Sequence, residues 1–404
     1  MEAWTASGRR GISRRANREG EMEPIYLDHA ATTALRPEVR EAMLSVWGEG
    51  LGNPSSVHRL GRASRTRLEE ARERIASILG AKRTEIVFTG GGTEADNLAI
   101  LGRWRAVGGA GGFGSVACSA IEHKAVLGAV RQAGREGASV VILGVDDRGE
   151  VDPSSVAVVL STRPAVVSVM WGNNEVGTIQ PVAEIAALCR AAGVAFHTDA
   201  VQAFGRTKVR VDEIECDLLS LSAHKIGGPT GIGALYVRTG VELDPLTFGG
   251  GQERGYRPGT ENVAAAVGFA VAAELAERER TSEAERLTGL RRRLETGLLD
   301  RVPGLIINGQ GAPRLPHVLS VSVPGVDPES LVLMLDLEGL AVSSGSACQS
   351  GAVEPSHVLV AMGRTGEEGT VRLSLGRTTT EQEIADAIER FVAVVDRARA
   401  HASA

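Results

Sequence analysis

Short apolar runs alternate with amphipathic segments along most of the chain from about residue 65. Nearly continuous apolar runs are typical of strands that a parallel sheet buries on both faces. The segments between them have helical spacing, as at 182–192, and the helical pattern at 65–79 ends at Gly80. The pattern predicts an α/β domain with a largely parallel sheet, with strands at residues 85–89, 115–119, 139–143, 165–170, 194–198 and 217–221.

The pattern changes after residue 260. Residues 261–300 are rich in Ala, Glu, Arg and Leu, and they read as long helices that carry the chain away from the first domain. Shorter strands and amphipathic helices follow Pro303, which is consistent with a smaller α+β domain. The predicted strands span residues 318–323 and 370–375, and the predicted helices span 329–337 and 381–397.

The start of the chain differs from the rest, because it has little apolar content before the strand-like residues 24–27. It contains Arg9, Arg10, Arg14, Arg15 and Arg18. No apolar core segment follows these arginines, so a secretory signal is excluded. We expect a disordered extension or an upstream start, with Met22 as a second start, and an organellar transit peptide stays open. Elsewhere no apolar run is long enough for a transmembrane helix.

Composition narrows the class of protein. The 404 residues include 44 basic and 50 acidic side chains, a net charge of −6, so no overall polycation suggests nucleic-acid binding. The cysteines lie far apart and form no CxxC pair, which argues against a structural zinc site or a disulfide framework and fits a reducing cytoplasm. They are Cys118, Cys189, Cys216 and Cys348.

A glycine-rich turn at 90–97 follows the strand predicted at 85–89 and opens a helix. Its glycines allow a tight turn, and Thr93 with Asp96 resembles a capping box. Free N–H groups at such a helix start can hold an anion such as a phosphate. No GK[ST] follows, which excludes a P-loop, and a purely structural strand-to-helix turn remains an alternative.

Two further strand ends carry candidate chemistry. Lys225 follows the strand predicted at 217–221 and lies in a loop rich in Gly and Pro, where burial would make its amine a Schiff-base former. Asp199 ends the strand predicted at 194–198, at the sheet edge where open α/β sheets bind ligands. A carboxylate there suits the pyridine nitrogen of pyridoxal phosphate (PLP). An exposed loop lysine, and a metal ligand or helix N-cap for Asp199, are the alternatives.

Cys348 lies in the small, polar, Gly-rich run 342–351, which predicts an exposed and mobile loop. Free cysteines are more often buried packing residues, and we expect this of Cys118, Cys189 and Cys216. Cys348 is the exception, because nothing around it could form a core.

These segments, taken together, resemble the NifS/IscS-like cysteine desulfurases of the class V aminotransferase group, which are fold-type I PLP enzymes. The resemblance runs from about Ile25 to Arg397, and the Ser-Ser-Gly-Ser-Ala-Cys form at 343–348 is similar to the IscS/NifS group rather than the SufS group. The matching segments are 26–33, 52–56, 90–97, 122–124, 173–177, 196–202, 222–229, 257–260, 342–351 and 372–377.

The resemblance implies a fold. Its large domain holds a mostly parallel seven-stranded sheet between helices, and we expect it over residues 37–275. The smaller α+β domain would combine residues 24–36 with 276–404 and carry the cysteine loop, which leaves 1–23 as the extension. The resemblance also implies a cytoplasmic homodimer that binds neither membrane nor, directly, nucleic acid.

The resemblance further assigns cofactor contacts. Lys225 would carry PLP covalently and move protons at the substrate carbon, while His123 would stack on the pyridine ring and act as acid and base. Asp199 would pair with the ring nitrogen. Near the phenolic oxygen the resemblance places Asn174 and Gln202, and around the phosphate it places Gly92, Thr93, Ser222, His224 and, from the partner subunit, Thr260. No metal is implied.

For the substrate, L-cysteine, the resemblance places Arg372 on the carboxylate, with Asn53 and Asn174 nearby. Cys348, as a thiolate, would attack the substrate sulfur and leave a persulfide and alanine. The persulfide would pass to an acceptor protein for iron–sulfur assembly, tRNA thiolation or DNA phosphorothioation, between which the sequence does not choose.

Three other functions are the alternatives: a related aminotransferase, a selenocysteine lyase and a non-catalytic scaffold. A related aminotransferase needs no protein thiol, so Cys348 disfavours it, but this cysteine does not separate cysteine from selenocysteine as substrate. A non-catalytic scaffold that docks sulfur acceptors is disfavoured because Lys225, His123, Asp199 and Cys348 are all retained. For His123 a satisfied polar position, and for Arg372 a structural ion pair, are the alternatives.

Overall fold

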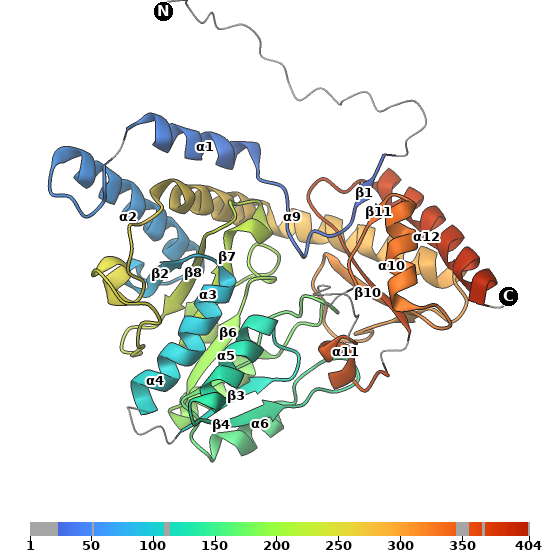
Figure 1. Ribbon diagram of the computed structural model, residues 1–404, viewed down its shortest axis with the longest axis horizontal. Coiled ribbons are helices and arrows are strands. Elements are labelled where there is room, and N and C mark those ends of the chain that lie inside the picture. The colour runs from blue at the N-terminus through green and yellow to red at the C-terminus, as the bar shows by residue number, and fades with distance from the viewer. Residues whose placement is uncertain (1–22, 51, 109–113, 345–354, 366–367, 403–404) are drawn as a thin grey trace, which may run out of the picture.

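The computed structural model describes residues 23–50, 52–108, 114–344, 355–365 and 368–402, so almost all of the predicted extension lies outside the described part. A seven-stranded sheet organises the larger part of the chain (Figure 1). Its strand order is β2 (Ile86–Thr89), β8 (Gly233–Val237), β7 (Leu218–Ser222), β6 (Ala195–Asp199), β5 (Val166–Ser168), β3 (Ser115–Ser119) and β4 (Ser139–Leu143). The strands from β7 to β4 are parallel, whereas β8 is antiparallel to both neighbours, which confirms the predicted mostly parallel sheet.

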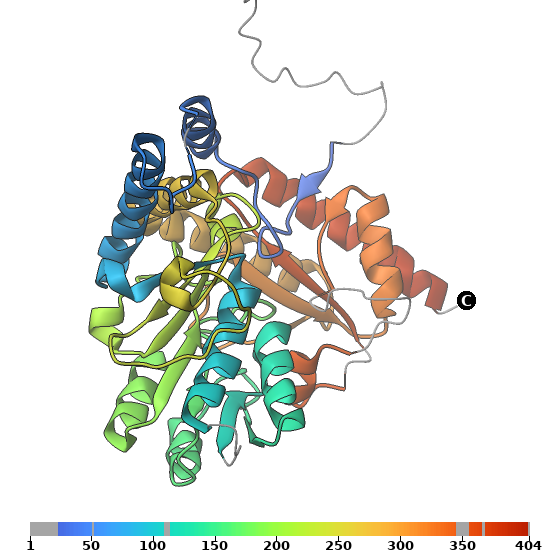
Figure 2. The same cartoon turned by 60° about the vertical axis from the view of Figure 1, so that its left-hand side comes forward.

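Helices cover both faces of this sheet, because successive apolar side chains point to opposite faces (Figure 2). Ile86 and Phe88 belong to one apolar core, and Val87 between them belongs to the other. The first core includes side chains from α1 (Pro37–Gly48), α2 (Arg59–Leu79), α6 (Pro153–Leu160), α7 (Val182–Ala192) and α9 (Val263–Arg301). The second core includes side chains from α3 (Gly92–Asn97), η2 (Leu98–Gly102), α4 (Arg103–Gly108) and α5 (Lys124–Arg135).

A single helix of 39 residues, α9, replaces the several helices expected at 261–300 and links the two parts of the molecule (Figure 1). Its side chains between Ala265 and Ala276 pack in the first core, and those between Leu287 and Leu298 pack in a separate core. The helix therefore changes packing partner along its length without breaking.

The separate core surrounds a three-stranded antiparallel sheet. This sheet has the order β12 (Gly369–Ser374), β10 (Val318–Val323) and β9 (Ile306–Ile307), and it packs with α10 (Pro328–Leu337) and α12 (Glu381–Ala402). The chain start joins here too, because β1 (Ile25–Tyr26) pairs in parallel with β11 (Leu340–Ala341). The Leu27 carbonyl then accepts a hydrogen bond from the backbone N–H of Ser374 at 2.6 Å. Residues on the strand β12 are thereby held beside the first residues of the fold.

Three differences from the predicted elements have physical reasons. The strand β8 was not predicted, because its sequence Gly-Ala-Leu-Tyr-Val continues a glycine-rich loop. The strand β4 was predicted to be buried on both faces, but it is an edge strand and most of its side chains are partly or fully exposed. The capping box of Thr93 and Asp96 is wrong: Gly91 is the N-cap of α3, and no side chain caps it.

The remaining described elements are short. They are η1 (Arg83–Glu85), α8 (Val211–Ile214), η4 (Ala223–Ile226), η5 (Gln252–Gly255) and α11 (His357–Ala361). Among the described helices, none combines the length and the apolar character that a bilayer crossing requires.

Candidate active site

A pocket of about 550 Å³ lies where the carboxyl ends of the large sheet's strands face β12 of the small sheet. Asp199 ends β6, Ser222 ends β7, and Arg372 projects from β12. Crevices at such strand ends are where open α/β sheets bind ligands. The lining residues are Asp28, Ala30, Ala31, Gly92, Thr93, Asp96, His123, Lys124, Met170, Asn174, Glu175, Asp199, Val201, Gln202, Ser222, His224, Lys225, Ser343, His357 and Arg372.

Lys225 reaches this pocket from η4, the single 3-10 turn that follows β7. Its Nζ donates to the carbonyl oxygens of Ala30 and Ala31, each at 2.6 Å. Burial, followed by the nearby charge of Arg372, lowers the pKa of this amine to about 8. A lysine with such a pKa has a substantial uncharged fraction near neutral pH, which an amine nucleophile requires.

Asp199 and His123 both line the pocket, and one potential ligand atom of each lies within 4.8 Å of the other. The Asp199 carboxylate is 5% exposed and accepts a hydrogen bond from the Val201 backbone N–H at 2.9 Å. Burial raises the pKa of the Asp199 carboxyl, and burial also lowers the pKa of His123. The Nδ1 atom of His123 accepts a hydrogen bond from the Ala125 backbone N–H at 3.2 Å. His123 is thus both the N-cap of α5 and a member of the pocket wall.

The glycine turn and the end of β7 form the opposite end of the pocket. Gly91 has φ 154° and ψ −179°, a conformation that in practice only glycine adopts. A Cβ on Gly92 would lie 2.8 Å from Cγ2 of Val201, so no larger residue fits there. The first N–H groups of the helical run that begins at α3 therefore stay open beside Thr93 and Ser222, which suits an anion.

Gln202 and Asn174 line the pocket between these two ends. The Gln202 amide donates to the carbonyl of Ala30 at 2.8 Å, and its Oε1 lies 3.3 Å from Nε2 of the buried His317. The backbone carbonyl of Asn174 accepts from Arg372 at 3.0 Å. Both predicted residues are therefore in the pocket and fixed by contacts with its rim.

Arg372 is almost fully buried and engaged from two sides. Its Nη2 lies 2.6 Å from Oδ1 of Asp28, and its Nη1 donates to Asn174. Its Nε is buried and has no hydrogen-bond partner among the described residues. The arginine is thus held in place, and the ion pair that stood as the alternative to a substrate role exists.

Several pocket residues carry chemistry that sequence reasoning missed. Asp96, Glu175 and His357 line the pocket, and Asp28 pairs with Arg372. Asp96 and Asp28 lie in segments that supported the resemblance, so their position was the only available signal. One potential ligand atom each from Asp96, His123 and Asp199 lies within 4.8 Å of the others.

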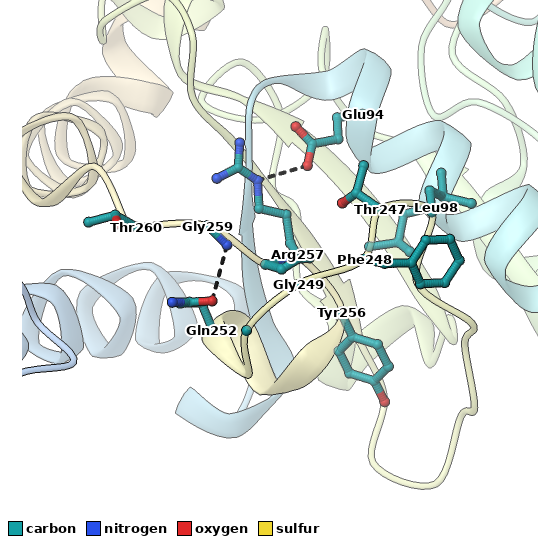
Figure 3. Close-up of a pocket in the computed structure, with 13 residues that line it drawn as sticks. Glu94, Leu98, Thr247, Phe248, Gly249, Gln252, Tyr256, Arg257, Gly259 and Thr260 are labelled. Atoms are coloured by element: carbon teal, nitrogen blue, oxygen red, sulfur yellow. Dashed lines mark hydrogen bonds and ion pairs between the residues drawn. The ribbon is translucent and has the colours of Figure 1, made fainter.

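Two predicted site residues do not line this pocket. Asn53 is exposed, and its Oδ1 accepts from the Ser55 backbone N–H at 2.8 Å. Thr260 is exposed and lines a different pocket of about 490 Å³, next to Arg257 and Glu94 (Figure 3). Cys348 lies outside the described residues.

The other three cysteines are buried, as predicted. Cys118, Cys189 and Cys216 are free thiols with no exposed surface. Burial raises the pKa of Cys189 to about 12 and also raises the pKa of Cys118 and of Cys216. None of the three can supply a thiolate near neutral pH.

Comparisons with known proteins show the family to which the chain belongs. The family model "Aminotransferase class-V" matches residues 25–386. The cysteine desulfurase IscS of Dictyoglomus turgidum is 45% identical over 373 residues, covering 91% of this chain and 94% of its own. The putative cysteine desulfurase IscS 1 of Bacillus subtilis is 44% identical and covers 93% of this chain and 100% of its own. The X-ray structure of a NifS-like protein from Rickettsia africae is 32% identical, with a TM-score of 0.83, and covers 93% of this chain and 100% of its own.

PLP enzymes of this family need an amine, a carboxylate for the ring nitrogen and an anion site. The pocket supplies all three, in Lys225, in the buried Asp199 and in the open helix start at Gly92. The donor set therefore fits PLP. Because the family model and these relatives match nearly the whole chain, the protein belongs to the class V aminotransferase family of PLP-dependent enzymes. Within this family it belongs to the cysteine desulfurases.

Proposed function

We propose that the protein converts L-cysteine to L-alanine and transfers the sulfur to Cys348 as a persulfide. The observation that carries the proposal is the single pocket that brings together the Lys225 amine, the Asp199 carboxyl and the Arg372 guanidinium. In the overall step the Cβ–S bond of the substrate breaks and an S–S bond to Cys348 forms. The substrate carbon gains a proton, so the step needs no external oxidant or reductant.

The residues that would hold PLP line the pocket at the carboxyl ends of β6 and β7. Lys225 would bind it covalently, Asp199 would pair with the ring nitrogen, and His123 would stack on the ring. PLP, when bound, supplies an electron sink for the substrate's Cα. Contacts to its polar edge and phosphate would come from Asn174, Gln202, Gly92, Thr93, Ser222 and His224.

Proton movements are assigned to Lys225 and His123. The pKa of each is lowered, chiefly by burial, so the uncharged form that accepts a proton is more populated near neutral pH than in an ordinary lysine or histidine. The Lys225 amine would take the proton from the substrate Cα. His123, which lies close to Asp199, would carry protons at the ring and at the leaving sulfur.

The substrate carboxylate is assigned to Arg372. Its position in the pocket wall and its planar guanidinium favour a bidentate contact with a planar carboxylate. Asp28 would hold the guanidinium in place before the substrate arrives. Asn53 is exposed and does not line this pocket, so its contact with the substrate remains a prediction from the resemblance.

The position of the cysteine segment supports Cys348 as the sulfur acceptor. Ser343 before it and His357 after it both line the pocket, and they are described residues. Ser343 is paired with the backbone of Arg372, and Ser356 donates to the buried Glu175. Cys348 is five residues from Ser343, a reach of about 17 Å at most for an extended chain.

We also propose the assembly and the division of the chain. Residues 24–36 with 276–404 form a small domain, and residues 37–275 a large one, which the two separate cores support. The protein is proposed to act as a cytoplasmic homodimer in which Thr260 completes the partner's phosphate site. A protein that accepts the persulfide sulfur would complete the reaction.

Product analysis tests this function. The purified protein with PLP, L-cysteine and dithiothreitol should form alanine and sulfide in equal amounts, and L-serine should form neither. After cysteine treatment without reductant, mass spectrometry should find one added sulfur on the peptide containing Cys348. Alanine formation without any sulfur on Cys348 would contradict the proposal.

A further inference from the structure

Arg72 and Glu253 form a buried ion pair between the helix α2 and the turn η5. The distances are 2.6 Å from Nη1 to Oε2 and 2.7 Å from Nη2 to Oε1, and the side chains are 4% and 2% exposed. The same carboxylate accepts the backbone N–H of Phe88 at 2.8 Å, and Arg72 also donates to the Ile86 carbonyl at 2.8 Å. The guanidinium lies 4.7 Å from the centre of the Phe88 ring. With Nε of Arg72 donating to Glu69 at 3.1 Å, every nitrogen and oxygen of the two charged groups has a partner within the protein.

This ion pair holds a strained piece of backbone. Glu253 has φ 45° and ψ 41°, and Arg254 has φ 58° and ψ 26°, so two successive non-glycine residues adopt the left-handed conformation. Gly255 continues it with φ 85°. Such strain persists only where the surroundings fix it, and it gathers at functional positions. Because a buried ion pair adds little net stability compared with apolar packing, its value here lies in fixing geometry.

The strained turn shapes the exposed segment that follows it. The side chain of Gln252, next to Glu253, accepts the backbone N–H of Gly259 at 3.1 Å (Figure 3). A second attachment joins Arg257 to Glu94 at 3.0 Å. Thr260 directly follows Gly259, the last residue held by these contacts. Its side chain is exposed and does not line the PLP pocket of its own chain.

We propose that Arg72 is a positioning residue for the PLP site of a second copy of the chain. Through Glu253 it holds the turn that presents Thr260 to the phosphate of PLP in the partner subunit. The inference rests on the proposed homodimer in which Thr260 completes the partner's site. It goes further, because it assigns a residue buried beside its own strand β2 to the neighbour's site and not to its own.

Mixed dimers of purified full-length chains test this assignment, with one chain tagged so that heterodimers can be isolated. Arg72→Met as a homodimer should bind PLP about tenfold more weakly than the wild type, the loss expected for weakened phosphate contacts. In a heterodimer with Lys225→Ala, the pocket of the Arg72→Met chain receives a native turn from its partner. Covalent PLP on that chain, measured by borohydride reduction and mass spectrometry, should then return to wild-type affinity.

Three comparisons fix the interpretation. Arg72→Met with Thr260→Ala should show no recovery, because both chains then supply a defective segment. Arg74 lies on α2, as Arg72 does, and forms a more exposed ion pair with Glu274 of α9. The Arg74→Met homodimer should therefore keep the PLP affinity of the wild type. Glu253→Gln keeps part of the hydrogen bonding, so it should show a smaller loss with the same heterodimer recovery if Arg72→Met does not fold.

The failure of each idea has its own result. If Thr260→Ala with Lys225→Ala recovers but Arg72→Met with Lys225→Ala does not, Arg72 acts on its own chain and the inference is overturned. The shared site would then stand. If neither combination recovers after subunit exchange is verified, the shared site fails and the inference fails with it.

Discussion

Asp28 and Arg372 form an ion pair of 2.6 Å at the wall of the pocket, and they come from opposite ends of the chain. Asp28 follows the first strand of the fold, and Arg372 lies on β12, which the backbone of Leu27 contacts. The small sheet therefore brings a cation to the pocket together with the anion that holds it. A substrate carboxylate would share or replace the contact that Asp28 makes.

Removal of this cation should affect substrate binding and leave the cofactor in place. Arg372→Leu should raise the KM for L-cysteine by roughly 100-fold, the loss expected for one or two charged hydrogen bonds. Asp28→Asn is the matched variant, because it keeps the guanidinium and removes only its partner's charge, so its KM should rise far less. Steady-state kinetics with saturating PLP, beside the absorbance of bound PLP, give both values. An equal rise in KM for the two variants would make the ion pair purely structural.

Capture of PLP by Lys225 should follow the lowered pKa of its amine. Covalent attachment requires the uncharged amine, so the rate for apoenzyme should rise with pH and level off above an apparent pKa of about 8. An ordinary lysine would still gain rate well above that pH. Stopped-flow absorbance of PLP mixed with apoenzyme between pH 6.5 and pH 10 measures this, at roughly constant ionic strength.

Lys225→Ala is the companion variant, and it should show neither covalent PLP nor activity. Recovery of a borohydride-reducible bond between PLP and this variant would assign the cofactor to a different lysine. Lys124, which also lines the pocket, is the residue to examine in that case.

Sequence pattern predicted the sheet well because its strands are short apolar runs ended by polar residues. The ends of β6 and β7 were located to within a residue or two, and with them Asp199 and Lys225. The strand β8 was missed because its first residues continue a glycine-rich loop. Local sequence also does not indicate that an antiparallel strand lies between β2 and β7.

The pocket wall from the small sheet could not be derived from local pattern. Asp28 and Arg372 are 344 residues apart, and only tertiary pairing of the chain start with β12 brings them together. The sequence predicts that Asp96 takes part in a capping box. In the structure Gly91 is the N-cap of α3 instead, and Asp96 lines the pocket. His357 carried no signal of its own, and Glu175 had only its position in the segment 173–177 that supported the resemblance.

A buried carboxyl below the pocket predicts a pH effect on stability. Glu122 is fully buried and accepts hydrogen bonds from Ser119 at 2.6 Å and from the Met170 backbone at 2.7 Å. Burial raises its pKa to about 8, so the folded state favours the protonated acid. Its contribution to stability is complete below the pKa of the unfolded chain and is lost as the pH rises through about 8.

Glu122→Gln should remove that loss, because the amide keeps the shape and an acceptor oxygen without the charge. The Tm difference between variant and wild type should shift in the variant's favour by on the order of 2 °C from pH 6 to pH 8.5. Thermal unfolding followed by circular dichroism at both pH values measures it. A Tm difference that is the same at both pH values would mean that Glu122 does not titrate in this range.

Cys348→Ser should separate cofactor chemistry from sulfur transfer. A serine hydroxyl is far too weakly acidic to replace the thiolate as nucleophile, whereas PLP is held by Lys225 and its neighbours in the pocket. The variant should therefore bind PLP with wild-type affinity and change its absorbance when L-cysteine binds, yet release almost no sulfide. Ser346→Ala, in the same segment, is the matched control and should retain turnover. Sulfide and alanine formed by Cys348→Ser at the wild-type rate would remove this cysteine from the reaction, because the remaining thiols at positions 118, 189 and 216 are buried and protonated near neutral pH.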